Sequence, residues 1–170
     1  METVKINPKR CSMFKSGQKA VLRTISERLG VDAAYKDGSV EIDGEGGAEW
    51  VAAMVVSAIN LGFEPAKAYK LFSENYYLEI IDLDLYFARN EKLIERYAAR
   101  VIGLEGKSKR VIEELSDAYI SVWEHKIGII GTFEDLSGAR EAVNRLLQGS
   151  THAGVFTFLE KQRKLKRLPR

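Results

Sequence analysis

Gly103 and Gly106 stand three residues apart, directly before a cationic stretch. Glycines at this spacing let the backbone bend tightly and come close to a polyanion, although many such pairs are ordinary turns. The apolar residues of the following KSKRVIEELS recur at helical spacing, which predicts an amphipathic helix beginning at Lys107. The unpaired N–H groups of its first turn would point at a phosphate, and Lys107, Lys109 and Arg110 would add positive charge. These residue types therefore predict a turn that binds a phosphate backbone.

The elements that would position this turn surround it in a definite order. YYLEIIDL predicts a strand, and NEKLIERYAARVIG predicts a helix that ends at Gly103. After the turn and its helix, AYISVW, the short connection EHK and IGIIG predict a hairpin, and FEDLSGAREAVNRLLQG predicts a closing helix. This order resembles a KH domain, in which the turn clamps the backbone of four unpaired nucleotides while a groove reads bases.

The KH resemblance implies a set of RNA-contacting residues around the turn. Ile102 and Ile120 are candidates for the groove floor, but aliphatic residues beside a turn are usually buried, so core packing is an equal alternative for both. Lys109 stands at a position where KH domains often have an aliphatic residue that lines the base groove. The residues implied to contact RNA are Arg100, Ile102, Gly103, Leu104, Glu105, Gly106, Lys107, Lys109, Arg110 and Ile120.

Composition and length indicate a cytosolic globular protein. The chain has 170 residues, of which 45% are hydrophobic, enough for one ordinary domain or two small ones. It has no apolar run of about 18 residues to span a membrane, and METVKINPKR lacks the apolar region of a signal peptide. The single Cys11 and the two histidines, His125 and His152, offer no metal-ligand spacing. We expect no cofactor and no bound metal.

An enzyme is the first rival class of function. It would need a nucleophile with a base, or paired carboxylates, and neither is evident. Glu79, Asp82 and Asp84 alternate along a predicted strand and could share a divalent cation, as in a nuclease. Alternating acids on the solvent face of a strand are the commoner case, so we expect no catalytic activity.

The net charge of +2 conceals a strong segregation of charge. Seven cations lie between Glu2 and Gly30, and eleven carboxylates lie between Val31 and Asn90. Six cations follow Glu160. Clustered cations attract phosphate, which predicts accessory RNA contacts from both ends of the chain, with a solubilising tail as the alternative at the C-terminus. The accessory candidates are Lys15, Lys19, Arg23, Lys161, Arg163 and Lys164.

The two halves of the chain show an internal similarity. Ile25 aligns with Ile112 at an offset of 87 residues (112 − 25), and at the same offset Gly44 aligns with Gly131. In the first half TVKI predicts a strand, residues 12–30 a helix, the alternating runs around Asp37-Gly38 a hairpin, and AEWVAAMVVSAINLGF a buried helix. In this alignment SGQK replaces the Gly-x-x-Gly turn, so the clamp of the first copy is degenerate.

These elements predict an α+β chain of two tandem type I KH domains. Each has the order βααββα, with a three-stranded antiparallel sheet packed on three helices. The expected divisions are a first KH domain over 1–63, a linker helix over 64–76, a second KH domain with the working turn over 77–149 and a basic tail over 150–170.

The motifs LEIIDL, RVIGLEGKSKRVIEEL, AYISVW, IGIIG, AREAVNRLLQGS and HAGVFTFLEKQRK occur in this order. With them the chain resembles the archaeal two-KH proteins related to the eukaryotic ribosome assembly factor called Partner of Nob. The resemblance implies binding of single-stranded RNA near the 3′ end of small-subunit ribosomal RNA and help in processing or methylating that region. The implied protein partners are translation initiation factor two, through its alpha subunit, and rRNA-processing proteins. One departure is Leu104, where relatives usually have a basic residue.

Two further functions stay open at this point. A protein-interaction adaptor would explain the degenerate first copy and the acidic middle of the chain. A messenger-RNA regulator could use KH domains outside the ribosome, and only the family motifs argue against it.

Overall fold

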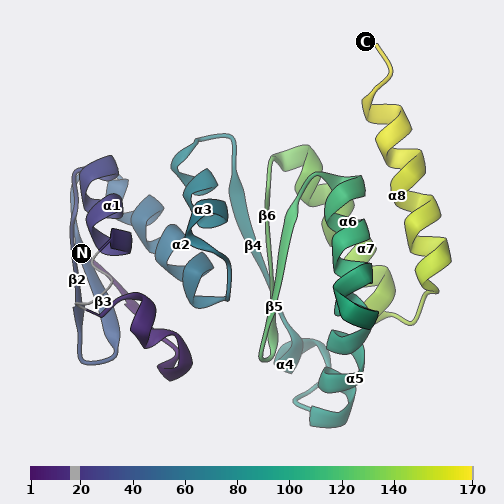
Figure 1. Cartoon of the computed structure of the whole chain (residues 1–170), viewed down its shortest axis with the longest axis horizontal. Coiled ribbons are helices and arrows are strands. Elements are labelled where there is room, and N and C mark those ends of the chain that lie inside the picture. Colours follow the sequence, from purple (N-terminus) through teal and green to yellow (C-terminus); the bar gives the residue numbers. More distant parts are fainter. Residues whose placement is uncertain (16–19, 170) are drawn as a thin grey trace. The chain divides into compact units, whose positions relative to one another are not determined.

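The computed structural model describes residues 1–15 and 20–169, and the chain divides into two compact units, Met1–Glu74 and Asn75–Arg170. Each unit combines helices with one three-stranded antiparallel sheet (Figure 1), so the α+β class is confirmed. Within the described residues, no helix is long and apolar enough to cross a bilayer.

The first unit builds its sheet in the order β1-β3-β2. Strands β2 and β3 form a hairpin in which Lys36 faces Ser39, so Asp37 and Gly38 make the expected two-residue turn, both with positive φ. The elements are β1 (Glu2–Lys5), a 3-10 helix (Pro8–Met13), α1 (Ala20–Leu29), β2 (Asp32–Lys36), β3 (Ser39–Asp43), α2 (Ala48–Asn60), α3 (Pro65–Ala68) and a second 3-10 helix (Tyr69–Phe72).

Two segments of the first unit differ from expectation. The stretch 12–30, predicted as one helix, begins inside a separate 3-10 helix (Pro8–Met13), which Asn7 caps and whose Arg10 guanidinium donates to the carbonyl oxygen of Ile59. Helix α1 covers Ala20–Leu29, and residues 16–19 lie outside the described structure. The segment 64–76, predicted as a linker helix, includes α3 and the second 3-10 helix within the first unit, where Ala68 and Leu71 are buried.

The second unit builds its sheet in the order β4-β6-β5, with Tyr77 paired to Gly131 and Asp82 to Lys126. Strands β5 and β6 form the predicted hairpin, and α5 and α6 flank the glycine turn. The elements are β4 (Tyr77–Asp82), α4 (Leu83–Tyr86), α5 (Glu91–Ile102), a 3-10 turn (Leu104–Gly106), α6 (Lys107–Ser116), β5 (Tyr119–Trp123), β6 (Lys126–Gly131), α7 (Phe133–Leu147) and α8 (His152–Lys166).

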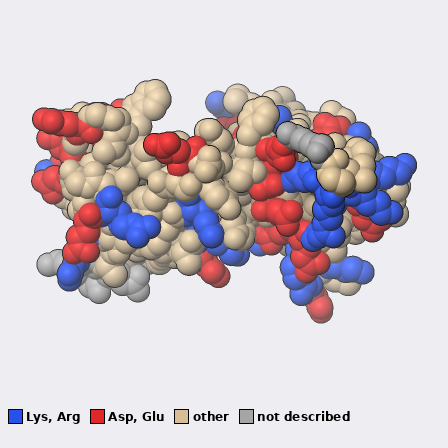
Figure 2. Space-filling view, turned by 90° about the horizontal axis from the view of Figure 1, so that it is seen from above, with Lys and Arg blue, Asp and Glu red and all other residues tan. Residues whose placement is uncertain are grey.

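The segment expected as a basic tail is mostly a packed helix, α8. Val155 and Leu159, one helical turn apart, are buried, and α8 lies against α6 and α7. The Arg163 guanidinium donates to the carbonyl oxygen of Glu114 on α6, and Lys166 pairs with Asp135 on α7. Figure 2 shows Lys and Arg side chains gathered on the right-hand part of the view, bordered by carboxylates. The cations of α8 thus sit on a helix that the core holds in place.

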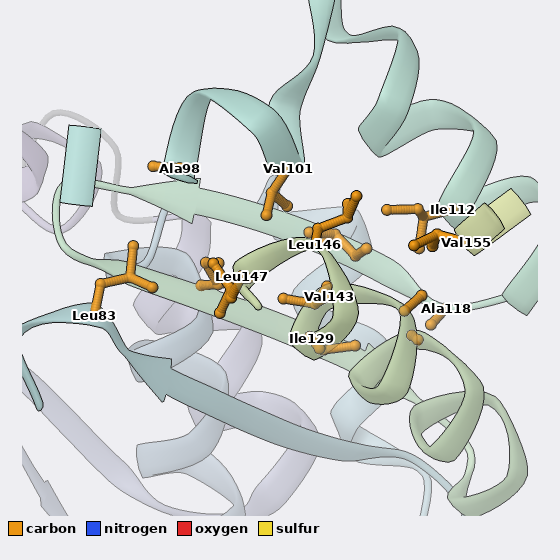
Figure 3. Close-up of a cluster of buried hydrophobic side chains, with 14 of the residues drawn as sticks. Leu83, Ala98, Val101, Ile112, Ala118, Ile129, Val143, Leu146, Leu147 and Val155 are labelled. Carbon is orange, nitrogen blue, oxygen red and sulfur yellow. The ribbon is translucent and has the colours of Figure 1, made fainter. Parts of the chain in front are cut away.

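The core of the second unit joins the helices on both sides of the glycine turn to the sheet. Val101 of α5, Ile112 of α6 and Ile129 of β6 are fully buried in one cluster with Val143 of α7 and Val155 of α8 (Figure 3). Burying such a side chain stabilises a fold by about 1.5–3 kcal/mol. The turn between Val101 and Ile112 is therefore anchored at both ends.

Several elements of the two units start 87 residues apart. Strand β2 starts at Asp32 and β5 at Tyr119, strand β3 starts at Ser39 and β6 at Lys126, and helices α1 and α6 end 87 residues apart, at Leu29 and Ser116. Two pairs of residues with positive φ also lie 87 residues apart, since Gly30 (66°) corresponds to Asp117 (64°) and Asp37 (45°) to Glu124 (52°). Gly30 and Asp117 each follow a helix, in the left-handed conformation common at helix C-termini.

Candidate nucleic-acid interface

The glycine turn adopts backbone conformations that explain its two glycines. Gly103 has φ 74° and ψ 174°, a combination that is essentially confined to glycine, and its N–H donates to Ala99 O to end α5. Gly106 has φ 75° and ψ 13°, the left-handed conformation, and precedes the first residue of α6. Between them Glu105 also has positive φ, 51°.

Gly103 also permits a close approach of the backbone to α6. A Cβ atom added at Gly103 would lie 2.6 Å from both the backbone nitrogen and the Cβ of Ser108. Ser108 is 3% exposed, and its hydroxyl has no hydrogen-bond partner among the described residues. A Cβ added at Gly106 would meet nothing within 4 Å. Gly103 is thus required because a larger residue would overlap α6, whereas Gly106 is needed mainly for its left-handed backbone conformation.

The apex of the turn faces solvent. Leu104 is 86% exposed, and Glu105, Lys107 and Arg110 are exposed as well. Gly106 brings no side chain to cap α6, so the N–H groups of the first helical turn are not capped by the residue that precedes them. The positive end of the helix dipole and Lys107 together attract an anion to this place.

Arg100 lies beside the turn but is engaged inside the protein. Its guanidinium donates to the carbonyl oxygens of Leu146 and Ser150 and lies 5.8 Å from the ring centre of Tyr97. The Arg100 carbonyl oxygen in turn lies 2.8 Å from Nε2 of His152. Arg100 therefore ties the end of α5 to the end of α7 and the start of α8.

Two more of the predicted RNA contacts, Ile120 and Lys109, are engaged within the fold. Ile120 is 2% exposed and belongs to the core, whereas Ile102, also predicted for the groove floor, is 37% exposed beside the turn. Lys109 lies 3.5 Å from Glu113, whose Oε1 accepts a hydrogen bond of 2.8 Å from the Ile120 N–H. Sequence reasoning missed Glu113, although its spacing of four residues from Lys109 on one helix was a usable signal.

The accessory cations differ in their surroundings. Lys15, Lys161 and Lys164 are exposed. Arg23 pairs with Glu27 at 2.6 Å, and Arg163 is held by the end of α6. Lys19 lies outside the residues that the structure describes.

The acids considered as a metal site have separate structural partners. Glu79 pairs with Arg140 at 3.0 Å, Asp82 accepts hydrogen bonds from the first N–H groups of α4, and Asp84 pairs with His125 at 2.9 Å. In residues 1–15 and 20–169, no group of three or more His, Cys, Asp or Glu side chains is arranged to hold a metal ion.

His125, at the β5–β6 turn, bridges two acids from different helices. Its Nδ1 lies 2.9 Å from Asp84 and its Nε2 lies 3.2 Å from Glu91. Desolvation acts to lower the pKa of His125, but the hydrogen bond to Asp84 and the charges of Glu91 and Asp84 together outweigh it and raise the pKa. When it is protonated, the ring carries a positive charge between these two carboxylates and holds the hairpin to α4 and to the start of α5.

This bridge predicts a pH dependence of stability. The contribution of His125 is fully present below the pKa of an unfolded histidine, about 6.5, and is lost as pH rises through the higher folded pKa. The free energy of unfolding of the wild type should therefore fall relative to that of His125→Gln as the pH rises above about 6.5. Urea titrations of both proteins across this range measure the difference. Parallel pH profiles would show that the bridge contributes nothing.

Comparison with known proteins identifies the family to which this fold and its glycine turn belong. Residues 77–164 match the model for the second KH domain of PNO1, described as a eukaryotic-type KH domain, KH-domain type I. The chain belongs to the PNO1 family of KH-domain proteins. It is 41% identical to a KH domain-containing protein of Methanocaldococcus jannaschii over 98% of this chain and 76% of that protein.

A further relative and a solved structure extend the comparison. The pre-rRNA-processing protein pno1 of Aspergillus fumigatus is 32% identical to this chain over 62% of its length, and the matched region covers 43% of the Aspergillus protein. A chain in the crystal structure of an a/eIF2alpha–aDim2p–rRNA complex from Pyrococcus horikoshii matches with a TM-score of 0.85 and 31% identity, over 96% of this chain and 93% of that one. The type I KH fold of the second unit is therefore established.

Proposed function

We propose that the protein binds single-stranded RNA during small-subunit biogenesis and holds the rRNA near its 3′ end through the turn Gly103–Gly106. The observation that carries this proposal is the exposed turn at the uncapped start of α6, within a KH fold. Such a turn clamps the backbone of unpaired nucleotides. A pre-rRNA-processing relative and a neighbour whose crystal contains rRNA support the same conclusion.

We also propose that the two units are copies of one KH unit. The support is the 87-residue spacing of the ends of α1 and α6, of the starts of β2 and β5 and of β3 and β6, and of the positive-φ pairs Gly30 and Asp117 and Asp37 and Glu124. The sheets also have corresponding strand orders, β1-β3-β2 and β4-β6-β5. The first copy has SGQK where the second has its turn, and those residues lie outside the described structure. The phosphate clamp is thus assigned to the second copy.

The RNA contacts are assigned to side chains that are free to make them. Lys107 and Arg110 supply charge beside the turn, and Lys161 and Lys164 extend it from α8. Arg100 acts instead by positioning the end of α5, because its guanidinium is bound to backbone carbonyls. The alpha subunit of translation initiation factor two is the proposed protein partner, supported by the neighbour's crystallised complex.

A substitution at the apex tests the clamp. Leu104→Asp should weaken binding of an unstructured RNA by about three- to tenfold without unfolding the protein, because the added charge repels phosphate and the side chain is 86% exposed. Leu104→Lys should strengthen binding and steepen its dependence on salt. Fluorescence anisotropy at several salt concentrations measures both effects.

The matched control is Leu85→Asp on α4, where the leucine is 79% exposed in the same unit. It should leave RNA affinity nearly unchanged. Equal losses of RNA affinity in Leu85→Asp and Leu104→Asp would show that the turn is not part of the RNA site. An RNA hairpin stem should bind worse than an unstructured strand, since KH domains read unstacked bases.

A protein-interaction role is the second candidate. The exposed Leu104 beside Glu105 at the apex favours this role, because an apolar and an acidic side chain add nothing to the binding of phosphate. Crosslinking in cells with sequencing of the bound RNA distinguishes the candidates. Reads concentrated at the 3′ end of small-subunit rRNA support the proposed function, and few reads from any RNA favour the protein-interaction role. Reads spread over messenger RNAs indicate a regulator outside the ribosome.

A further inference from the structure

The second unit contains a groove between the start of helix α7 and the last turn of helix α8. Its volume is about 560 Å³, within the range of ligand pockets in proteins. The lining comes from α7, from α8 and from the turn that follows α8, and it includes Phe133, Glu134, Leu165, Lys166 and Leu168. The groove therefore belongs entirely to the unit that carries the glycine turn.

Three large apolar side chains of this groove are exposed to solvent. Phe133 is 78% exposed, Leu165 68% and Leu168 61%. Single exposed apolar residues scattered over a surface are normal, whereas a gathered apolar patch with a polar rim marks an interaction site. These three side chains meet at one hollow, so we read the groove as a surface that binds another molecule.

The fold holds both walls of the groove in place. Lys166, in the last turn of α8, pairs with Asp135 in the first turn of α7. Thr132 caps α7 by accepting a hydrogen bond from the Asp135 N–H. Leu159 anchors α8 in the core. A ligand would thus meet a groove that is already formed, which lowers the entropy lost on binding.

The groove lies at the opposite end of α6 from the glycine turn. At the start of α8, Nε2 of His152 lies 2.8 Å from the carbonyl oxygen of Arg100, close to the turn. Near the end of α8, the Arg163 guanidinium donates to the carbonyl oxygen of Glu114, in the last turn of α6. Helix α6 has 10 residues and is about 15 Å long. A molecule in the groove would therefore leave the turn free.

The charges around the groove favour an acidic segment of a protein. Lys161 and Lys164 are exposed, and Lys161 stands one helical turn before Leu165. On the α7 wall, Glu134 repels a phosphate backbone, whose charge is continuous. A peptide can instead place an apolar side chain beside Glu134 and its carboxylates on the α8 side, so that it complements both walls.

We propose that this groove docks a short, acidic, amphipathic segment of a partner protein. Apolar side chains of the segment contact Phe133, Leu165 and Leu168, as when an amphipathic helix lies in a groove, and its carboxylates lie beside Lys161 and Lys164. The inference does not rest on the RNA-binding function. The cations that the proposed function gives to the RNA would contact the partner's carboxylates when the partner is bound.

A library of random short peptides displayed on phage and selected on the full chain tests the inference. We expect the selected peptides to be acidic, with apolar residues at helical spacing. Their affinity, measured by fluorescence anisotropy on synthetic copies, should fall about tenfold in Leu165→Asp, which removes an apolar contact and repels carboxylates. The matched control is Leu85→Asp, at a leucine that is 79% exposed on α4, and it should bind the peptides like the wild type.

Two further variants test the other wall and the charges. Phe133→Asp should give a similar loss of peptide affinity, and it keeps the test decisive if Leu165→Asp does not fold, because an acid suits the first turn of α7. Lys161→Glu combined with Lys164→Glu should weaken the same peptides and make their binding less dependent on salt.

The contrary results are distinct from one another. Selected peptides that are not acidic, or that bind both groove variants like the wild type, would overturn the inference. Loss of RNA affinity in Leu165→Asp and Phe133→Asp without an effect on the peptides would assign the groove to RNA instead. A wild-type dimer that Leu165→Asp abolishes would assign the groove to a second copy. The RNA affinity of Leu104→Asp tests the turn separately, so the proposed function can fail while this inference stands.

Discussion

Gly103→Ala is expected to lower the free energy of unfolding by roughly 2–5 kcal/mol and to abolish tight RNA binding. The backbone at Gly103, with φ 74° and ψ 174°, is strained for any residue with a Cβ. The new methyl would also lie 2.6 Å from the Ser108 nitrogen, which belongs to α6 and cannot move without shifting that helix. Relief of the overlap must therefore displace the turn that approaches phosphate.

Gly106→Ala is the matched control for this substitution. Its φ of 75° and ψ of 13° are left-handed, and open space surrounds the new methyl, so the expected destabilisation is only about 1–2 kcal/mol. Urea unfolding followed by circular dichroism, with RNA anisotropy on the same samples, measures both variants. Equal destabilisation by the two alanines would show that the Gly103–Ser108 contact is not limiting.

Leu159→Ala on α8 should lower the free energy of unfolding by about 2–5 kcal/mol. Leu159 is 1% exposed and lies in the core cluster with Val143, Leu146 and Val155, so its truncation opens a cavity there. Leu165→Ala on the same helix removes a side chain that is 68% exposed and should change stability by less than about 0.5 kcal/mol.

This pair of variants decides whether α8 is part of the fold. A frayed, solubilising terminus would make both substitutions nearly neutral. A packed α8 makes only Leu159→Ala costly, and the loss should appear in the same cooperative transition as the rest of the second unit. A separate early transition in Leu159→Ala would show that α8 unfolds independently.

The sequence by itself determined the elements whose signals are local. Asp37-Gly38 predicts the β2–β3 hairpin because both residues accept positive φ, and Lys36 does face Ser39. The turn between Gly103 and Gly106 is found from glycine spacing followed by an amphipathic helix, and the structure starts α6 at Lys107 as expected. Periodicity and turn chemistry act over a few residues, so one chain is enough to reveal them.

Only the tertiary structure decided which side chains face solvent and which are already bound. Arg100 looks like an RNA ligand by charge and position, but its partner Leu146 lies 46 residues away. Ile120 is in the core because β5 packs against helices from other parts of the chain. Residues 150–170 have the composition of a basic tail, yet the contacts of Val155 and Arg163 with distant helices hold His152–Lys166 as α8. Such contacts leave no local pattern, since they depend on how separate elements meet in space.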